Sequence, residues 1–171
     1  MEKKHKLIAA IDAGTTGTRC CIINEYGEIV SGGYYPMKTF YPGLGRVEQD
    51  PETVTGLTFR AVADAVSSID AKEISGLCIT VQRNSFVPVA KDGSFLSNMI
   101  IWQDQRGEEA HPWMLDCLKK NGMSTDDFYR INGQPFGSFQ FGFKALWFRK
   151  FREDIYRKTY KFITPLAFLA R

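Results

Sequence analysis

LIAAIDAGTTGTRCCIIN, residues 7–24, contains two apolar runs on either side of a polar, glycine-rich turn. The first run is short and stops at Asp12, which is typical of a buried strand. A second strand is expected over residues 19–24, and a third over 28–35 after a turn that contains Gly27. We therefore expect the chain to open with three antiparallel strands.

The rest of the sequence alternates between helical and strand patterns. A helix is expected to start at Asp50-Pro51-Glu52 and to reach about residue 67. Aspartate caps helix starts, proline fits the first helical position, and an acidic residue there favours the helix dipole. Further strands are expected over residues 74–81, 86–90, 95–102 and 161–164, and further helices over 104–121, 124–129 and 142–151. This order predicts an α/β fold in which helices pack on a mixed sheet.

Length and composition limit the possible classes of protein. The chain has 171 residues, enough for about one domain, and 44% of them are hydrophobic and 24% charged, as in ordinary globular proteins. The four cysteines show no C-x-x-C spacing, so neither a disulfide framework nor a zinc site is indicated. No apolar run is long enough for a signal peptide or a membrane span. We expect a cytoplasmic protein with free thiols and no membrane partner.

The net charge of +3 is unevenly distributed. Residues 144–171 carry eight basic and two acidic residues, together with several aromatic ones. A basic, aromatic tail of this kind can bind RNA by stacking. The helical spacing of Trp147, Phe148 and Phe151 instead favours a packed helix flanked by lysine and arginine stems. We therefore expect no nucleic-acid partner.

Residues 12–19, DAGTTGTR, have the composition of a phosphate-binding turn. Glycines let backbone N–H groups approach phosphate oxygens, threonine hydroxyls add donors, and Arg19 offers a forked cation. Asp12 is a candidate ligand for Mg²⁺, which prefers carboxylate and water oxygens. The pattern is neither a Walker A motif nor G-x-G-x-x-G. From the residues alone, a hairpin whose aspartate and threonines merely satisfy turn hydrogen bonds is an equal alternative.

Five stretches, in the same order and at similar spacing, resemble the FGGY family of carbohydrate kinases. They are residues 12–19, 45–51, 79–83 and 100–106, and the pair Asn132-Gly133 with Lys144 and Trp147. The resemblance covers nearly the whole chain. It implies an α/β, ribonuclease-H-like (actin-like ATPase) domain over residues 1–171. It also implies ATP-dependent transfer of a phosphoryl group to a hydroxyl of a small sugar or polyol.

The resemblance assigns roles to two sets of residues. Those for the cofactors lie on the first turn: Asp12 for Mg²⁺, and Gly14, Thr15, Thr16 and Arg19 for the transferred phosphate of ATP. Those for the acceptor lie on later strand ends and loops: Gln82, Arg83, Asn84, Trp102, Asp104 and Phe139. Asp12 and Arg19 would be the catalytic pair.

Purely structural roles are possible for several of the predicted acceptor residues. Trp102 could equally be a core aromatic, because tryptophan is usually mostly buried. Asp104 could cap the helix that follows it. Arg106, which would shape the rim of the site with Asp104, could instead pair with Glu108 or Glu109 on an exposed helix face.

Two positions depart from the pattern of glycerol kinase. Asn84 stands where glycerol kinase has a glutamate, and Phe139 stands where it has a substrate-contacting tyrosine. A site built to hydrogen-bond a small polyol loses much affinity when such partners are missing. We therefore expect an acceptor other than glycerol. Residues 128–134, together with 154–157, resemble the autoinducer-2 kinases and other sugar kinases more closely.

The resemblance also implies that part of the machinery lies outside residues 1–171. In this family the general base is an aspartate beyond the matched region, and the adenine pocket belongs to a second lobe. Asp126 and Asp127 follow Ser124 as helix-start residues and are not candidates for the base. We expect a truncated N-terminal domain that is inactive alone, that docks a C-terminal lobe and that forms a homo-oligomer.

The docking face is expected among the apolar residues near the end of the chain. Phe162, Leu166, Phe168 and Leu169 are the candidates for it. A large exposed apolar patch of this kind usually marks an interaction site.

Two other functions are open. The chain could be a non-catalytic actin-like module that binds nucleotide or sugar, or one half of a split kinase. It could also be a nuclease of the ribonuclease-H-like fold, which needs several convergent carboxylates for two metal ions. Gln82, Arg83 and Asn84 suit hydroxyl recognition better than metal binding.

Overall fold

Residues 6–170 are described in the computed structural model, and they divide into two units. Unit 1 takes in the described residues of Met1–Thr39, Gln49–Arg83 and Pro165–Arg171. Unit 2 takes in Phe40–Glu48 and Asn84–Thr164.

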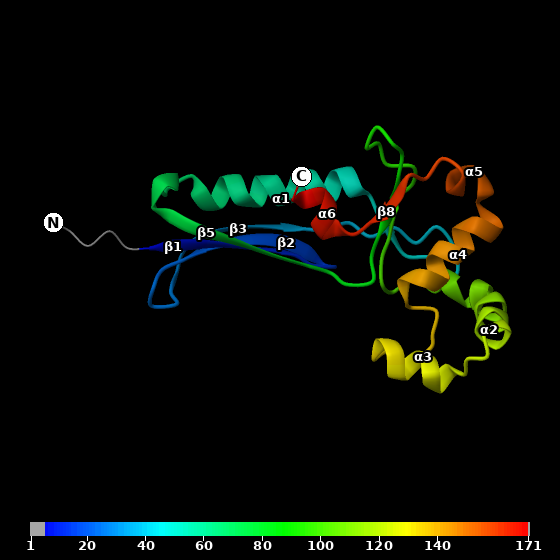
Figure 1. Ribbon diagram of the computed structural model, residues 1–171. Coiled ribbons are helices and arrows are strands. Elements are labelled where there is room, and N and C mark those ends of the chain that lie inside the picture. The colour runs from blue at the N-terminus through cyan, green and yellow to red at the C-terminus, as the bar shows by residue number, and fades with distance from the viewer. Residues whose placement is uncertain (1–5, 171) are drawn as a thin grey trace. The chain divides into compact units, whose positions relative to one another are not determined.

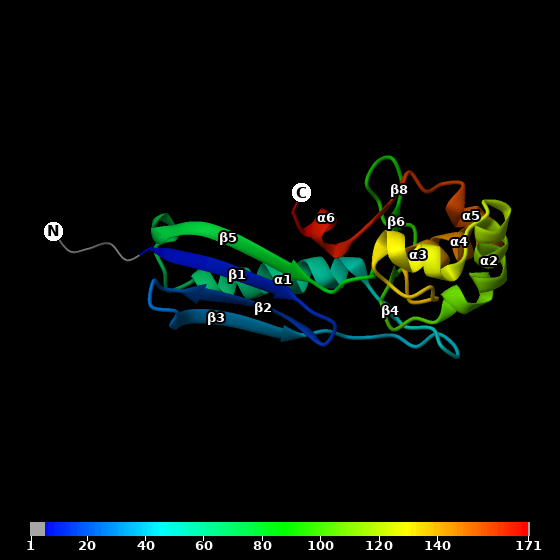
Figure 2. The same ribbon diagram turned by 60° about the horizontal axis from the view of Figure 1, so that its bottom comes forward.

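Unit 1 is built on a mixed four-stranded sheet (Figure 2). Its strands are β1 (Leu7–Ala13), β2 (Gly17–Ile23), β3 (Ile29–Pro36) and β5 (Ile74–Val81), in the order β3-β2-β1-β5. β1 pairs with β2, and β2 with β3, in antiparallel fashion, whereas β1 and β5 are parallel. The antiparallel opening and the mixed sheet predicted from the sequence are thus confirmed.

Helix α1 (Pro51–Val66) runs along one face of this sheet (Figure 1). Its start follows the prediction, because the Asp50 side chain accepts hydrogen bonds from the backbone N–H groups of Glu52 and Thr53. Ala61 and Ala65 face the strands, and a Cβ on Gly33 of β3 would collide with the Ala61 carbonyl. Only glycine therefore allows the helix and sheet to pack this closely.

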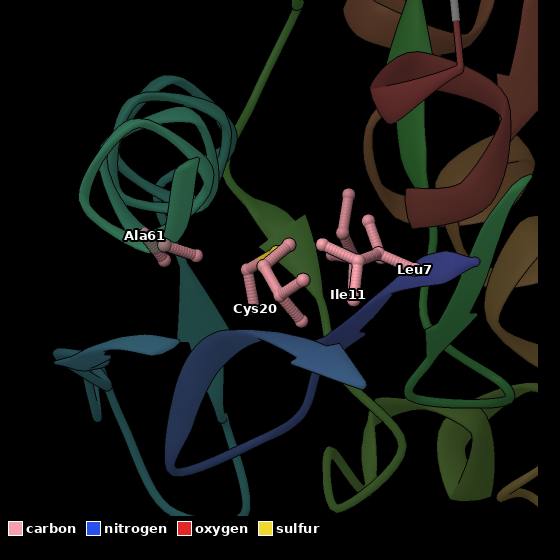
Figure 3. Close-up of a cluster of buried hydrophobic side chains, with 7 residues drawn as sticks. Leu7, Ile11, Cys20 and Ala61 are labelled. Carbon is pink, nitrogen blue, oxygen red and sulfur yellow. The ribbon is translucent and has the colours of Figure 1, made fainter. Parts of the chain in front are cut away.

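The core of unit 1 lies between α1 and the sheet. Alternate residues of β1 and β2 point into it, as the period of two in a strand requires. Figure 3 shows this cluster, which consists of Leu7, Ala9, Ile11, Cys20, Ile22, Ala61 and Ala65. A short 3-10 helix, η1 (Ala71–Glu73), follows α1 and leads into β5.

Of the four apolar residues among which a docking face is expected, the structure exposes Leu166 and buries Phe168 and Leu169. Helix α6 (Pro165–Leu169) returns to unit 1 and packs on β5 and α1 (Figure 1). This packing buries Phe168 and Leu169, and leaves only Leu166 of this helix's large apolar side chains exposed. Phe162 is half-buried among other aromatic rings of unit 2.

Unit 2 combines short strands with several helices. The strands are β6 (Val87–Val89), β7 (Met99–Ile100) and β8 (Lys161–Ile163), and β4 (Glu48–Gln49) lies at the border of the two units. β6 and β8 pair in antiparallel fashion. The helices are η2 (Arg106–Ala110, a 3-10 helix), α2 (His111–Lys120), α3 (Thr125–Asn132), α4 (Phe141–Phe151) and α5 (Glu153–Tyr156).

Two predicted elements of unit 2 differ from the structure. The strand expected over residues 95–102 is reduced to β7, because Ser97 and Asn98 hydrogen-bond locally and to Glu48 rather than within a ladder. The helix expected over 104–121 begins as η2 and becomes α-helical only at His111.

The core of unit 2 is aromatic. Phe86 is fully buried, and its ring centroid lies 4.5 Å from that of Phe141 and 5.4 Å from that of Phe162. Phe148 of α4 joins this cluster, so the aromatic stripe packs as its helical spacing indicates. No helix within residues 6–170 is long and apolar enough to cross a membrane.

Candidate functional site

The turn between β1 and β2 is held by donors from its own unit. The Gly14 N–H donates to the Gly17 carbonyl across 3.0 Å and closes the turn. The Thr16 carbonyl accepts from the Met37 N–H at 2.9 Å, and the Thr15 carbonyl accepts from Gln49 Nε2 at 2.7 Å. These acceptor oxygens are therefore occupied within the protein. An anion-binding turn needs this arrangement, because a carbonyl directed at a phosphate would repel it.

Asp12 and Arg19 are cross-strand partners on the sheet face opposite α1. Ile11 and Ala13 point toward the core, so Asp12 points away from it. Arg19 Nε lies 3.4 Å from Asp12 Oδ2, and the two side chains are 57% and 44% exposed. An exposed ion pair of this kind contributes about 1 kcal/mol or less, so little opposes its opening for a ligand.

The residues of this turn fit a minimal magnesium site. Among residues 6–170, no three His, Cys, Asp or Glu side chains group so that they could hold a metal ion. Mg²⁺ usually keeps several waters and binds through one or two carboxylates plus substrate phosphates. The half-exposed Asp12 carboxylate meets that requirement, and a nuclease with several convergent carboxylates does not fit this site.

Gln82 is brought next to the turn by the parallel pairing of β1 and β5. Its backbone N–H donates to the Ala13 carbonyl at 3.1 Å, and Thr15 Oγ1 lies 3.5 Å from Gln82 Oε1. Its Nε2 donates to Gln49 Oε1 at 2.8 Å. Arg83 follows it and is exposed.

Gln49 has no role in the sequence interpretation, yet it is fully buried and contacts both of these segments. The only signal for it was its place within the motif at residues 45–51. Its partners Thr15 and Gln82 lie more than thirty residues away in the chain, so local sequence patterns could not reveal them.

The other predicted acceptor residues belong to unit 2. Asn84 has a left-handed backbone, with φ of 55°, and it is the one non-glycine residue with positive φ in the described part of the chain. Asparagine tolerates this region better than most residues, and such positions are enriched at functional sites. Phe139 is half-exposed and just precedes α4, whose N-cap is Gln140.

Trp102 is not a core residue, because 46% of it is exposed. Its backbone N–H donates to Ser85 Oγ at 3.1 Å. The ammonium of Lys144 donates to the carbonyls of Ile101 and Trp102 at 2.8 and 3.1 Å. Lys144 is fully buried, and this burial lowers its pKa to about 8, although the nearby Asp104 carboxylate opposes the shift. The backbone beneath the Trp102 ring is thus anchored from the interior.

Asp104 belongs to an internal network rather than to an open rim. Its carboxylate accepts from the Val47 N–H at 2.7 Å and from three N–H groups of Arg106, and only 1% of the residue is exposed. Contact with an acceptor hydroxyl would require it to give up one of these hydrogen bonds. The structure therefore supports a loop-holding role. The prediction that Asp104 caps the following helix is wrong in detail, because the N-cap of η2 is Gln105 and Asp104 accepts from the Arg106 N–H one residue further on.

The alternative placement of Arg106 on an exposed helix face is wrong. Its side chain is 4% exposed and pairs with Asp104 and Glu48. Burial lowers the pKa of Arg106, but the hydrogen bonds to Asp104 and Glu48 raise it by more, so the guanidinium stays charged. Glu48 is 58 residues away in the chain, which explains why the helical pattern suggested nearer partners.

The structure confirms that Asp127 serves a helix start. Ser124 and Asp127 form a reciprocal capping box at the N-terminus of α3. The hydrogen bonds from Ser124 lower the pKa of the Asp127 carboxyl. It is therefore ionised and engaged at a helix end, as the sequence indicated.

The chain resembles known proteins over most of its length. The family described as "FGGY family of carbohydrate kinases, N-terminal domain" matches this chain over residues 7–171. Glycerol kinase 1 of Saccharolobus solfataricus is 40% identical over 131 residues, which are 73% of this chain and 26% of that protein. The chain thus spans about a quarter of the length of this relative.

Solved structures show the same fold. The ligand-bound xylulose kinase from Lactobacillus acidophilus superposes with a TM-score of 0.83 at 22% identity, over 96% of this chain and 32% of that one. Plasmodium falciparum glycerol kinase with ADP superposes with a TM-score of 0.74 at 21% identity, over 90% and 30%. The mixed sheet and its helices are therefore those of the sugar kinases, and this chain belongs to the FGGY family of carbohydrate kinases, whose N-terminal domain it matches.

Proposed function

We propose that this chain supplies the phosphate-binding turn and the acceptor-binding residues of an enzyme that transfers the terminal phosphoryl group of ATP to a sugar or polyol hydroxyl. The observation that carries the proposal is the turn at residues 12–19, whose carbonyls are occupied internally beside an exposed aspartate–arginine pair. Family membership and the ADP named with the Plasmodium falciparum structure support it.

In this proposal the residues of the turn position and neutralise the phosphate. Phosphoryl transfer needs little covalent chemistry from the protein, so positioning and charge carry most of the catalysis. Arg19 would exchange its weak pairing with Asp12 for the phosphate oxygens, while Thr15 and Thr16 would offer donors. Gly14, whose N–H closes the turn on the Gly17 carbonyl, would let the phosphate approach the backbone closely. Asp12 would hold Mg²⁺, which neutralises phosphate charge when bound.

The acceptor would meet Gln82, Arg83, Asn84, Trp102 and Phe139. The half-exposed Trp102 ring offers an apolar surface for the acceptor's carbon skeleton. Asn84 and Phe139 lack the carboxylate and hydroxyl of glycerol kinase, and this difference favours an acceptor other than glycerol. Asp104 contributes by holding the loop that carries Trp102.

We propose that the general base and the adenine pocket come from a second lobe. The curated relative is about four times longer than the matched region, and the carboxylates of both Asp104 and Asp127 accept hydrogen bonds from within the chain. The 171-residue chain alone is therefore expected to show no turnover.

The test is a coupled ADP-release assay on the product of the open reading frame that contains these residues. The panel of acceptors should include glycerol, pentuloses, hexoses and gluconate. We expect acceptor-dependent ADP release, a preference for a sugar over glycerol, and a loss of about 100-fold in kcat/KM for Arg19→Ala. Absence of acceptor-dependent release would contradict the proposed function, and turnover by the 171-residue chain alone would contradict the need for a second lobe.

A further inference from the structure

We propose that Gln49 is a positioning residue that holds the phosphate-binding turn and Gln82 together and fixes the face that Gln82 offers to the acceptor. This inference rests on the proposed function. One buried side chain would thus link the phosphate-binding turn to a residue that binds the acceptor.

Every polar group of the Gln49 amide is engaged in a hydrogen bond. Its Nε2 donates to the Thr15 carbonyl at 2.7 Å and to Thr39 Oγ1 at 3.1 Å, and its Oε1 accepts from Gln82 Nε2 at 2.8 Å. The side chain is fully buried, so water cannot replace a lost bond. The amide therefore ties its own segment to Thr39, ten residues away, and to Thr15 and Gln82, which are more than thirty residues away.

The donor and acceptor character of their partners fixes the orientation of the Gln49 and Gln82 amides. A backbone carbonyl can only accept a hydrogen bond, so the nitrogen of Gln49 has to face Thr15. Its oxygen then faces Gln82, which has to donate a hydrogen bond from its own nitrogen. Gln82 Oε1 is consequently turned toward the hydroxyl of Thr15, at 3.5 Å, and not toward the interior.

Gln49 also determines which atoms the turn at residues 12–19 presents. Gln49 holds the Thr15 carbonyl inward, and the Met37 N–H does the same for the Thr16 carbonyl. With both oxygens held, the turn offers donors and not acceptors to an arriving phosphate. Loss of the Gln49 donor would free the Thr15 carbonyl and place a repulsive oxygen within reach of the anion.

The experiment measures binding of magnesium pyrophosphate to the 171-residue chain by ¹⁵N NMR, since this probe needs no adenine pocket. The test variant is Gln49→Glu, which keeps the size of the side chain but sets a carboxylate oxygen against the Thr15 carbonyl. The matched control is Gln140→Glu, because Gln140 is another buried glutamine whose Nε2 donates to a backbone carbonyl, that of Pro135, at 2.6 Å.

We expect Gln49→Glu to weaken pyrophosphate binding about tenfold at pH 7.5, relative to the wild type and to Gln140→Glu. The introduced carboxyl group can donate to the Thr15 carbonyl when protonated. The ratio of wild-type to Gln49→Glu affinity should therefore fall as the pH is lowered toward 5, and Gln140→Glu shows how much of any loss comes simply from placing a carboxylate in the interior.

Each other outcome has a definite meaning. If the wild type and Gln140→Glu bind and Gln49→Glu binds equally well at pH 7.5, the inference about Gln49 is overturned while the phosphate turn stands. If Gln140→Glu weakens binding as much as Gln49→Glu, the effect is general destabilisation and the inference is also overturned. If the wild type gives no shifts in residues 12–19, the phosphate turn of the proposed function is overturned and the inference with it.

Discussion

The turn of unit 1 and the Asp104–Arg106 loop of unit 2 each place an aspartate beside an arginine, with opposite consequences. In the turn, Arg19 and Asp12 are 3.4 Å apart and about half-exposed. In the loop, Arg106 and Asp104 are 2.7 Å apart, and their side chains are 4% and 0% exposed. Exposed charges with few partners are available to a ligand. Buried charges whose hydrogen bonds are all made within the protein instead hold the backbone that carries other residues.

The largest expected effect breaks the buried pair. Replacing Arg106→Ala leaves the buried carboxylate of Asp104 and the partly buried carboxylate of Glu48 without their cation. We expect a loss of about 3–5 kcal/mol in the free energy of unfolding, measured by urea denaturation. A loss below about 1 kcal/mol would mean that this network does not hold unit 2. The matched exposed change, Arg19→Ala, should cost about 1 kcal/mol or less.

The second prediction uses the buried Lys144. Its folded pKa of about 8 lies below the value of 10.5 expected for an unfolded lysine, so the unfolded state binds more protons between these two pH values. The free energy of unfolding should therefore rise with pH from about 8 to 10.5, by about 3 kcal/mol at most. Below pH 8 both states are protonated and this contribution is flat.

The control for that prediction is Lys144→Met, which removes the titrating group. The difference in stability between the wild type and this variant should change with pH in the stated window. A pH-independent difference would show that the ammonium is not held in a desolvated site.

The third prediction concerns ligand binding at the exposed pair. Arg19→Ala should weaken the binding of magnesium pyrophosphate about tenfold, because a charged hydrogen bond to the phosphate is lost. The free energy of unfolding should change far less than in Arg106→Ala. Equal affinity of Arg19→Ala and the wild type, measured by NMR titration, would contradict the role of Arg19.

The smallest expected effect concerns the cap of α1. Asp50→Ala removes the acceptor for the N–H groups of Glu52 and Thr53. We expect a loss of about 1 kcal/mol in the free energy of unfolding and unchanged pyrophosphate affinity. A larger effect on pyrophosphate affinity than on stability would show that the start of α1 influences the conformation of the phosphate-binding turn.

The same contrast explains which parts of the structure the sequence could predict. The first three strands, the Asp50 cap and the Ser124 capping box rest on residues that are neighbours in the chain, and all are confirmed. Strand β5 has the bounds that its apolar pattern predicts. Local patterns carry this information because they reflect backbone preferences and the period of side-chain burial.

The candidate site was predictable in outline only. The turn at residues 12–19 was recognisable by its composition, but the burial of Arg106 and the commitment of Asp104 depend on Glu48 and Val47, which are distant in the chain. Gln49 was missed for the same reason. Long-range partners decide whether a charged residue faces a ligand or the interior, and no local pattern records them.

The most direct test of the account is an NMR titration of the wild-type chain with magnesium pyrophosphate, followed at the arginine Nε resonances. We expect the Arg19 Nε signal to shift together with the amides of residues 12–19, and the Arg106 Nε signal not to move. A shift at Arg106 with none at Arg19 would contradict the assignment of the phosphate site to the turn of unit 1.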